Sequence, residues 1–373
     1  MFHLSRSVTT YFKHLPGWST RRKLLLIESD DWGSIRMPSN EVRLELKKNG
    51  FLQKDSNFLK YDTLADKDDL AALFGTLSSV SDQHGNHAVF SPFVCVSNPD
   101  FNKITDSDYK EYFWEPFTTT LNRYYGDSVF PQWQIGMKEN LFIPQYHGRE
   151  HVNAPLLLKY LQSPSNHVNK AFHMGVVHLP IADISPLALR SLAPAYFINH
   201  GSEMEIYQRS LEEGVELFQS IFGHKPVSFA APNGIFHPEL EHTLAVHGIK
   251  GLVVNQKRLE PNLQGGLQSR SFHFSFGRKN QYGQTYYKRN VKFEPVQKDY
   301  SLNQSLFEIK AAFQMGKPAV VTSHRLNYIG VLSRNHREKN LEELRKLLQK
   351  VIIQHPDVEF ISSTQLVNLM NPS

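Results

Sequence analysis

The alternation of short apolar runs with longer helical patterns is the feature that most constrains the fold of this chain. Apolar runs at 24–27, 88–96, 227–231 and 319–322 end at turn residues, and segments with apolar residues at helical spacing lie between them. This alternation is typical of parallel β-strands joined by helical crossovers. We therefore predict an α/β fold, a closed or nearly closed (β/α) barrel with about seven or eight strands.

The chain has 373 residues, and neither a repeat period nor a linker interrupts it. We predict one domain over 1–373, with insertions near 98–145 and 257–300 where the alternation is lost. Within the second insertion, 268–295 alternates aromatic and polar residues and predicts one or two hairpins. The run 172–177 predicts a further strand.

Composition excludes several classes of protein. Cys95 is the only cysteine, so an intramolecular disulfide is excluded. The longest apolar runs are far shorter than the ~20 residues of a membrane-spanning helix. The N-terminal segment has no apolar core of the kind a signal peptide needs, which predicts a cytoplasmic protein without a membrane partner.

The net charge is +5, but most of the cations are spread along the sequence. Nucleic-acid binders usually concentrate their cations on one face or in one run. Here the concentrations are limited to 21–23 and 277–289, so we predict no nucleic-acid partner.

Reactive side chains follow several predicted strands directly. They are Asp30 and Asp31 after the first strand, the segment 232–234 after a middle one, and 323–325 after a late one. Active sites of α/β folds form where the carboxyl ends of parallel strands meet. We therefore expect these segments to converge on one site.

A metal site is predicted from a histidine pair and one of these acids. His147 and His151 are four residues apart, a spacing that would place both rings on one side of a helical turn. Two histidines and one carboxylate, here Asp31, form the ligand set of an open catalytic zinc site. Asp30 could accept a proton beside it if the chain turns at Trp32 and Gly33, because side chains alternate along a strand.

The same histidines allow a second interpretation. The segment 147–151 also matches the inverted zinc-peptidase pattern H-x-x-E-H, in which Glu150 would be the base. That pattern requires a sustained helix, whereas Pro144 and Pro155 bracket this segment and Gly148 lies inside it.

At this point the motifs resemble those of the polysaccharide deacetylase superfamily, metal-dependent carbohydrate esterases with a distorted, incomplete (β/α) barrel. The segment 27–33 resembles the first motif, the histidine pair the second, 229–234 the third and 320–324 the last. The resemblance implies that Asp30 is the catalytic base and that Asp31, His147 and His151 bind the metal. It further implies that the Asn233 N–H holds the oxyanion and that His324 is the general acid.

The resemblance implies metal-dependent hydrolysis of an N- or O-linked acetyl group on a saccharide, with metal-bound water attacking the carbonyl. One divalent ion is expected, with zinc as the first choice. Trp32, Pro232 and Arg325 are candidate substrate-binding residues. Trp114 and Trp133 could stack sugar rings or simply pack the first insertion.

The sequence also departs from the family pattern. Ala230 stands where the family usually carries an arginine that orients the catalytic aspartate, and Ser29 and Trp32 replace the usual residues of the first motif. Arg325 and Arg36 are candidates to supply the missing cation. The alternative function is a catalytically inactive, carbohydrate-binding member of the same fold.

Overall fold

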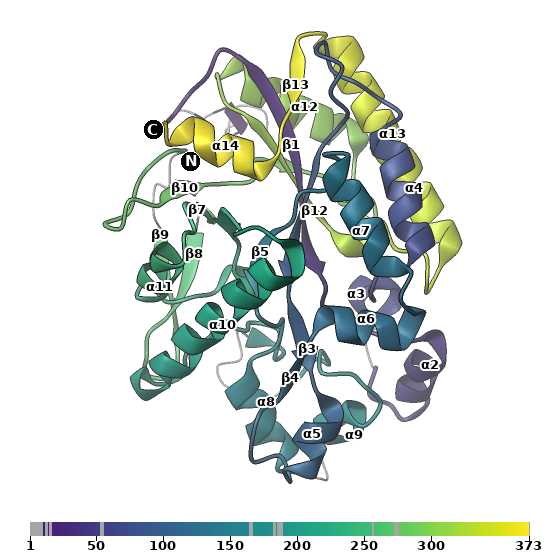
Figure 1. Cartoon of the computed structure of the whole chain (residues 1–373), viewed down its shortest axis with the longest axis vertical. Helices are drawn as coiled ribbons and strands as arrows, with labels where there is room; N and C mark the ends of the chain where they lie inside the picture. Colours follow the sequence, from purple (N-terminus) through teal and green to yellow (C-terminus); the bar gives the residue numbers. More distant parts are fainter. Residues whose placement is uncertain are drawn as a thin grey trace, which may run out of the picture.

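A parallel sheet of nine strands forms the centre of the computed structural model (Figure 1). The structure describes residues 10–11, 14, 17–52, 56–163, 167–181, 184, 189–255, 257–271 and 276–372. The prediction of no signal peptide concerns residues 1–23, of which 1–9, 12–13 and 15–16 lie outside the described residues. No helix in the described ranges combines the length and apolar character that crossing a membrane requires.

Eight strands follow one another in the order β10-β7-β6-β5-β2-β1-β12-β11, and β13 also pairs with β1. Their bounds are β1 (Lys23–Trp32), β2 (Phe90–Cys95), β5 (Gln145–Gly148), β6 (Ser228–Phe229), β7 (Gly251–Val253), β10 (Thr285–Tyr287), β11 (Val291–Lys292), β12 (Ala319–His324) and β13 (Val358–Phe360). The neighbouring strands of this sheet pair in parallel. No pairing joins β10 to β11 in the described ranges, so the barrel is incomplete. The predicted α/β fold is confirmed, with nine strands in the sheet where about seven or eight were expected.

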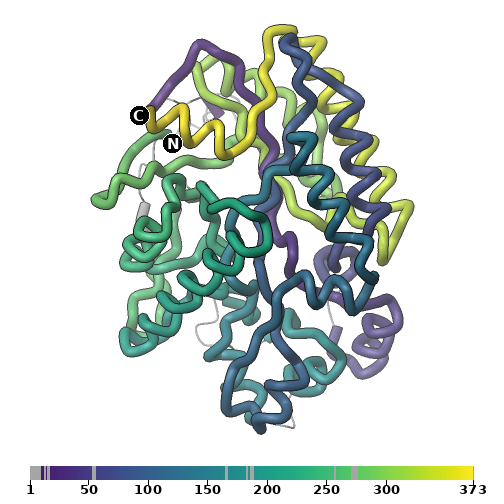
Figure 2. Tube along the Cα trace, in the orientation of Figure 1, coloured from purple at the N-terminus to yellow at the C-terminus, as the bar shows by residue number. Residues whose placement is uncertain are grey.

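The central strand β1 is buried on both faces. Leu24, Leu25, Leu26 and Ile27 are each at most 1% exposed. Such a continuous apolar run is typical of a parallel strand that helices cover on both sides. The purple tube of β1 accordingly runs through the interior of the molecule in Figure 2.

Helices pack around this sheet. On the right of Figure 1, α4 packs against α7 and α13, while α10 packs against α11 on the left. The bounds of the helices are α2 (Asn40–Lys48), α3 (Asn57–Tyr61), α4 (Lys67–Leu77), α5 (Phe101–Asp106), α6 (Phe117–Tyr125), α7 (Val129–Lys138), α8 (Ala154–Leu161), α9 (His167–Phe172), α10 (Met204–Phe222), α11 (Leu240–Val246), α12 (Leu302–Gln314), α13 (Arg334–Gln354) and α14 (Ser363–Met370). Short 3₁₀ helices are η2 (Gly201–Glu203), η3 (Pro232–Gly234) and η4 (Arg325–Asn327).

The segments predicted as insertions contain two small antiparallel sheets. β3 (Ser97–Pro99) pairs with β4 (Trp114–Pro116), and β8 (Lys257–Pro261) pairs with β9 (Leu267–Ser271). The prediction of hairpins over 268–295 is partly wrong, because β10 and β11 are parallel strands of the main sheet. The strand predicted at 172–177 is also wrong, since α9 ends at Phe172 and no strand follows it there.

Candidate active site

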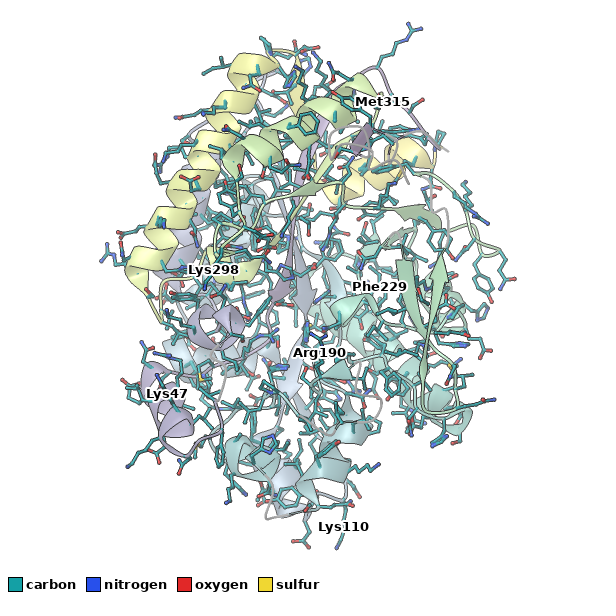
Figure 3. All side chains as sticks on the ribbon, turned by 180° about the vertical axis from the view of Figure 1, so that it is seen from behind. Lys47, Lys110, Arg190, Phe229, Lys298 and Met315 are labelled. Atoms are coloured by element: carbon teal, nitrogen blue, oxygen red, sulfur yellow. The ribbon has the colours of Figure 1, made fainter. Side chains whose placement is uncertain are left out.

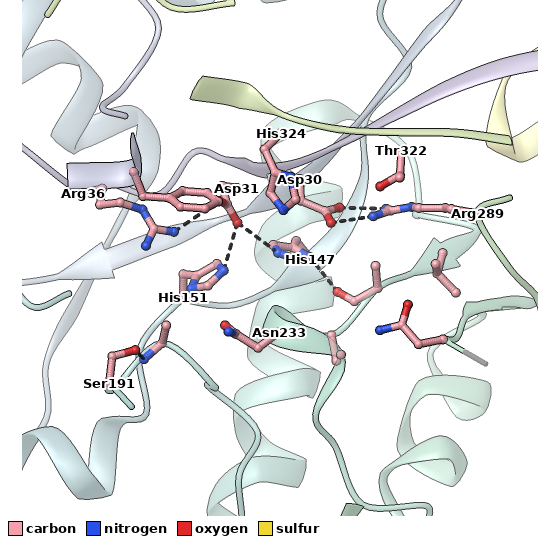
Figure 4. Close-up of a pocket in the computed structure, with 17 residues that line it drawn as sticks. Asp30, Asp31, Arg36, His147, His151, Ser191, Asn233, Arg289, Thr322 and His324 are labelled. Atoms are coloured by element: carbon pink, nitrogen blue, oxygen red, sulfur yellow. Dashed lines mark hydrogen bonds and ion pairs between the residues drawn. The ribbon is translucent and has the colours of Figure 1, made fainter. Parts of the chain in front are cut away.

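The carboxyl ends of β1, β5, β6 and β12 surround a cavity of about 380 Å³ (Figure 4). Parallel pairing of β1 with β12 sets Asp30 opposite His324 in register. His147 comes from β5, and Asn233 comes from the 3₁₀ turn after β6. These four residues line the cavity together with Asp31 and His151.

A turn at the end of β1 lets two successive aspartates face one cavity. Asp31 has φ +73°, the left-handed region that L residues rarely adopt, and the register between β1 and β2 shifts there. Gly33 follows with φ +80°, and a Cβ at that position would lie 2.1 Å from the Cys95 carbonyl oxygen. The local fold thus requires glycine at 33 and breaks the alternation that would otherwise separate the two acids.

Asp31, His147 and His151 form a buried cluster whose ligand atoms all lie within 4.8 Å of one another. The Asp31 Oδ1 atom is 2.9 Å from Nε2 of His151 and 3.5 Å from Nε2 of His147. Burial opposes the charge of Asp31, but His151 and Arg36 outweigh it and hold its pKa well below the ordinary carboxyl value. Burial also lowers the pKa of His151, which favours the neutral ring that a metal ligand needs.

The donor set of this cluster fits a divalent metal ion. His147 donates from Nδ1 to the carbonyl of Ala230 over 2.7 Å, because a carbonyl can only accept. Its Nε2 therefore carries the lone pair, and this buried atom has no hydrogen-bond partner. A ligand histidine held through its other nitrogen by a carbonyl is the usual arrangement in metal sites.

The histidine pair does not lie on a helical turn. His147 is in β5, His151 lies in the loop beyond it, and α8 begins only at Ala154. Glu150 pairs with Arg149 at 2.5 Å and does not line the cavity. The H-x-x-E-H interpretation is therefore contradicted, because its helix is absent and its base points into another ion pair.

Asp30 is held by an arginine that the sequence did not single out. Arg289, between β10 and β11, reaches both carboxylate oxygens of Asp30 at 2.5 and 2.7 Å. Its Nε donates to Glu28 at 2.7 Å, which fixes the guanidinium against the strand. Burial favours the neutral acid, but the charge of Arg289 overcomes it and lowers the pKa of Asp30 below the ordinary value.

His324 has an acidic partner of its own. Its Nδ1 lies 2.5 Å from Glu294, whose other carboxylate oxygen accepts from Asn327 at 2.8 Å. Burial would lower the pKa of His324, yet Glu294 raises it to about 9. Phe58 of α3 packs edge-on against the imidazole at 5.3 Å between ring centroids.

The two arginines proposed from sequence as partners of Asp30 lie elsewhere. Arg36 donates to Asp31 at 3.2 Å and to Asp62 at 2.9 Å, and Arg325 donates to Asp62 at 2.9 Å. In the described part of the chain, neither arginine pairs with Asp30. Arg289 could have been found only by recognising 285–287 as a strand of the main sheet, because it then follows a strand end.

The structure does not bring the three candidate substrate-binding residues into the cavity lining. Trp32 is 1% exposed and packs edge-on against Phe90, Trp133 and Phe142. Arg325 is fully buried, and Pro232 is buried at the start of η3, directly before the cavity residue Asn233.

The two tryptophans considered for sugar stacking do not line the cavity either. Trp133 is 2% exposed in the core, and the Arg149 guanidinium lies 5.4 Å from the Trp114 ring.

No protein-family model and no curated protein matches this chain. Among solved structures, a protein from Mycobacterium smegmatis described as a polysaccharide deacetylase is similar, with 12% identity, TM-score 0.47 and coverage of 96% of this chain and 93% of that one. A CE4-family pseudoenzyme from Bacillus anthracis has 10% identity and TM-score 0.39, with coverage of 93% and 66%.

A 4-α-glucanotransferase from Thermococcus litoralis is also similar, with 8% identity and TM-score 0.45. The match covers 92% of this chain and 40% of that one. At these identities the likenesses concern the fold, and function has to be argued from the site.

Proposed function

We propose that this chain is a divergent polysaccharide deacetylase that hydrolyses an N- or O-linked acetyl group on a saccharide with one divalent metal ion, zinc by first choice. The observation that carries the proposal is the convergence of three differently tuned groups in one cavity. These are the Asp31–His147–His151 cluster, the Asp30–Arg289 pair and the His324–Glu294 pair.

Asp31, His147 and His151 would hold the ion, which when bound supplies Lewis-acid polarisation of the acetyl carbonyl and activates a water. Asp30 would accept the proton of the attacking water. The low pKa that Arg289 imposes keeps Asp30 ionised and ready to accept it.

His324 would donate the proton that the leaving amine or alcohol takes up. Glu294 keeps the ring protonated at neutral pH and directs Nδ1 away from the substrate, so that Nε2 is the donor. The backbone N–H of Asn233, held at φ 58° in the cavity wall, would donate to the oxyanion.

An inactive carbohydrate-binding protein is the second candidate, and Ala230 is the feature that favoured it. The guanidinium that this position lacks has a counterpart in Arg289, which makes both hydrogen bonds to Asp30. That contact supports catalysis over binding alone.

The test is acetate release from acetylated amino sugars and acetylated xylan, measured after chelation and again after zinc is restored. Turnover that disappears with the metal and returns with it supports the proposal. Absence of acetate release from every substrate in the presence of zinc would favour the inactive protein.

A further inference from the structure

The charged groups in and directly behind the cavity wall nearly compensate one another before any metal ion is considered. In the described lining, Asp30 and Asp31 are the only acids, and each pairs with an arginine, Arg289 or Arg36. Behind the lining, Glu28 also pairs with Arg289, Asp62 pairs with Arg36 and Arg325, and Glu294 pairs with His324. These five acids exceed the four cations by one, so a divalent ion bound at the site would leave a net positive charge, which favours an anionic ligand.

One nitrogen of the Arg36 guanidinium is available to bind a ligand. Its Nε donates to Asp62 and its Nη2 donates to Asp31, while Nη1 has no hydrogen-bond partner in the described part of the chain. The guanidinium carbon lies 4.9 Å from the centroid of the Phe58 ring, so the group packs against this aromatic side chain of the wall. Figure 4 shows Arg36 beside Asp31, and both line the cavity, so an anion bound to Arg36 would lie near the Asp31–His147–His151 cluster.

A second arginine directly precedes a residue of the cavity lining. Arg190 comes before Ser191, which lines the cavity, and its side chain is exposed without an ion pair in the described ranges. Its backbone has φ 60°, and its carbonyl accepts from the Ile181 N–H at 2.9 Å. Figure 3 labels Arg190 near the middle of the molecule seen from behind.

We propose that the cavity selects an acetylated saccharide that carries an anionic group, a carboxylate or a phosphate, and that Arg36 and Arg190 bind this group. The inference rests on the proposed function and specifies its substrate class. A guanidinium presents paired donors that match a carboxylate or phosphate. The uncharged residues Ser191, Asn233 and Asn255 leave hydrogen-bonding groups in the wall for sugar hydroxyls.

Matched ligands test this proposal in the zinc-loaded protein. N-acetylglucosamine and its uronic acid differ only at C6, where a hydroxymethyl group is replaced by a carboxylate, and N-acetylglucosamine 1-phosphate adds a phosphate instead. Calorimetric titration of each ligand uses a His324→Gln background, so that turnover does not consume it. We expect at least one anionic sugar to bind ~5-fold tighter than the neutral one or better, with the difference shrinking as salt rises.

Arginine variants show which residues cause the preference for an anionic sugar. Arg190→Gln and Arg36→Gln should each reduce the ratio of neutral to anionic dissociation constants, whereas Arg209→Gln, an exposed arginine of α10 outside the cavity lining, should leave it unchanged. Arg190 is exposed, so its variant remains informative even if Arg36→Gln, which breaks a buried ion pair, does not fold. Which of the two anionic sugars binds tighter identifies carboxylate or phosphate as the recognised group.

Equal affinity for all three sugars, or a preference that survives both arginine variants, would overturn the inference. Acetate release from the otherwise unaltered protein separates this result from a failure of the proposed function. Hydrolysis without anion preference overturns only the substrate class, and anion preference without hydrolysis overturns only the catalytic proposal.

Discussion

The two sides of the cavity are built from different parts of the chain. On the side proposed to bind the metal, which we call the metal side, Asp31 meets the histidines of the 147–151 segment, and the carbonyl that holds His147 belongs to Ala230 in the third motif. On the side proposed to transfer protons, which we call the proton-transfer side, Asp30 and His324 belong to motifs, but Arg289 and Glu294 come from a segment with none. Asp30 and His324 thus come from short motifs, whereas the groups that set the pKa values of these two residues come from residues 285–294.

The largest effect expected on the proton-transfer side follows from Asp30→Asn. The amide cannot accept a proton, so turnover should fall ~10²–10⁴-fold, the range typical of general-base removal. Bound zinc should be retained, because Asp30 is outside the metal cluster. Steady-state kinetics and elemental analysis of the same sample check both statements. Loss of zinc would show that Asp30 is also needed for metal binding.

On the metal side, the sharpest structural test is Gly33→Ala. The new Cβ would meet the Cys95 carbonyl, so the free energy of unfolding should fall by about 3 kcal/mol. Gly283→Ala is the matched control, since it has nearly the same φ, +81°, and no atom within 4 Å of the added Cβ. Denaturant unfolding of both variants measures the difference, and equal losses would show that close packing at Gly33 is unimportant.

Arg289→Gln tests whether the segment 285–294 tunes the base. Without the guanidinium, Asp30 loses two hydrogen bonds and its pKa should rise, so kcat should fall ~30-fold while KM changes little. Arg289→Lys keeps the charge without the bidentate geometry and should recover part of kcat. If Arg289→Gln retained full kcat, Asp30 would not depend on this arginine.

The smallest effect is expected for Glu294→Gln, which retains a hydrogen-bond acceptor for His324 but removes the negative charge. The pKa of His324 should fall from about 9 toward its ordinary value. On raising the pH, the imidazolium would then lose its proton at a lower pH than in the unaltered protein. The basic limb of the kcat–pH profile should move to lower pH, with a loss of roughly tenfold at pH 8 and little change at pH 6. An unmoved basic limb would remove His324 from the role of general acid.

The sequence predicted those parts of the structure that depend on local pattern. The apolar run 24–27, predicted as a strand, forms the buried centre of β1. The convergence of strand ends followed from the general geometry of parallel sheets.

What the sequence did not predict depends on tertiary pairing. The spacing of His147 and His151 suggested a helical turn, but pairing with β2 and β6 makes 145–148 a strand. Aromatic alternation near 285–292 suggested hairpins, because a strand only two or three residues long carries no signal of its partner. Arg289 was missed for this reason, because it can be identified as a site residue only once 285–287 is known to be a strand that ends beside the cavity.

The metal content of the protein, purified without chelator or histidine tag, tests directly whether Asp31, His147 and His151 bind a metal ion. We expect about one divalent ion per chain, retained in Asp30→Asn and lost in Asp31→Ala, because only Asp31 shares the cluster with His147 and His151. An Asp31→Ala variant that keeps its ion would contradict this assignment. So would a protein that binds no ion even after incubation with zinc.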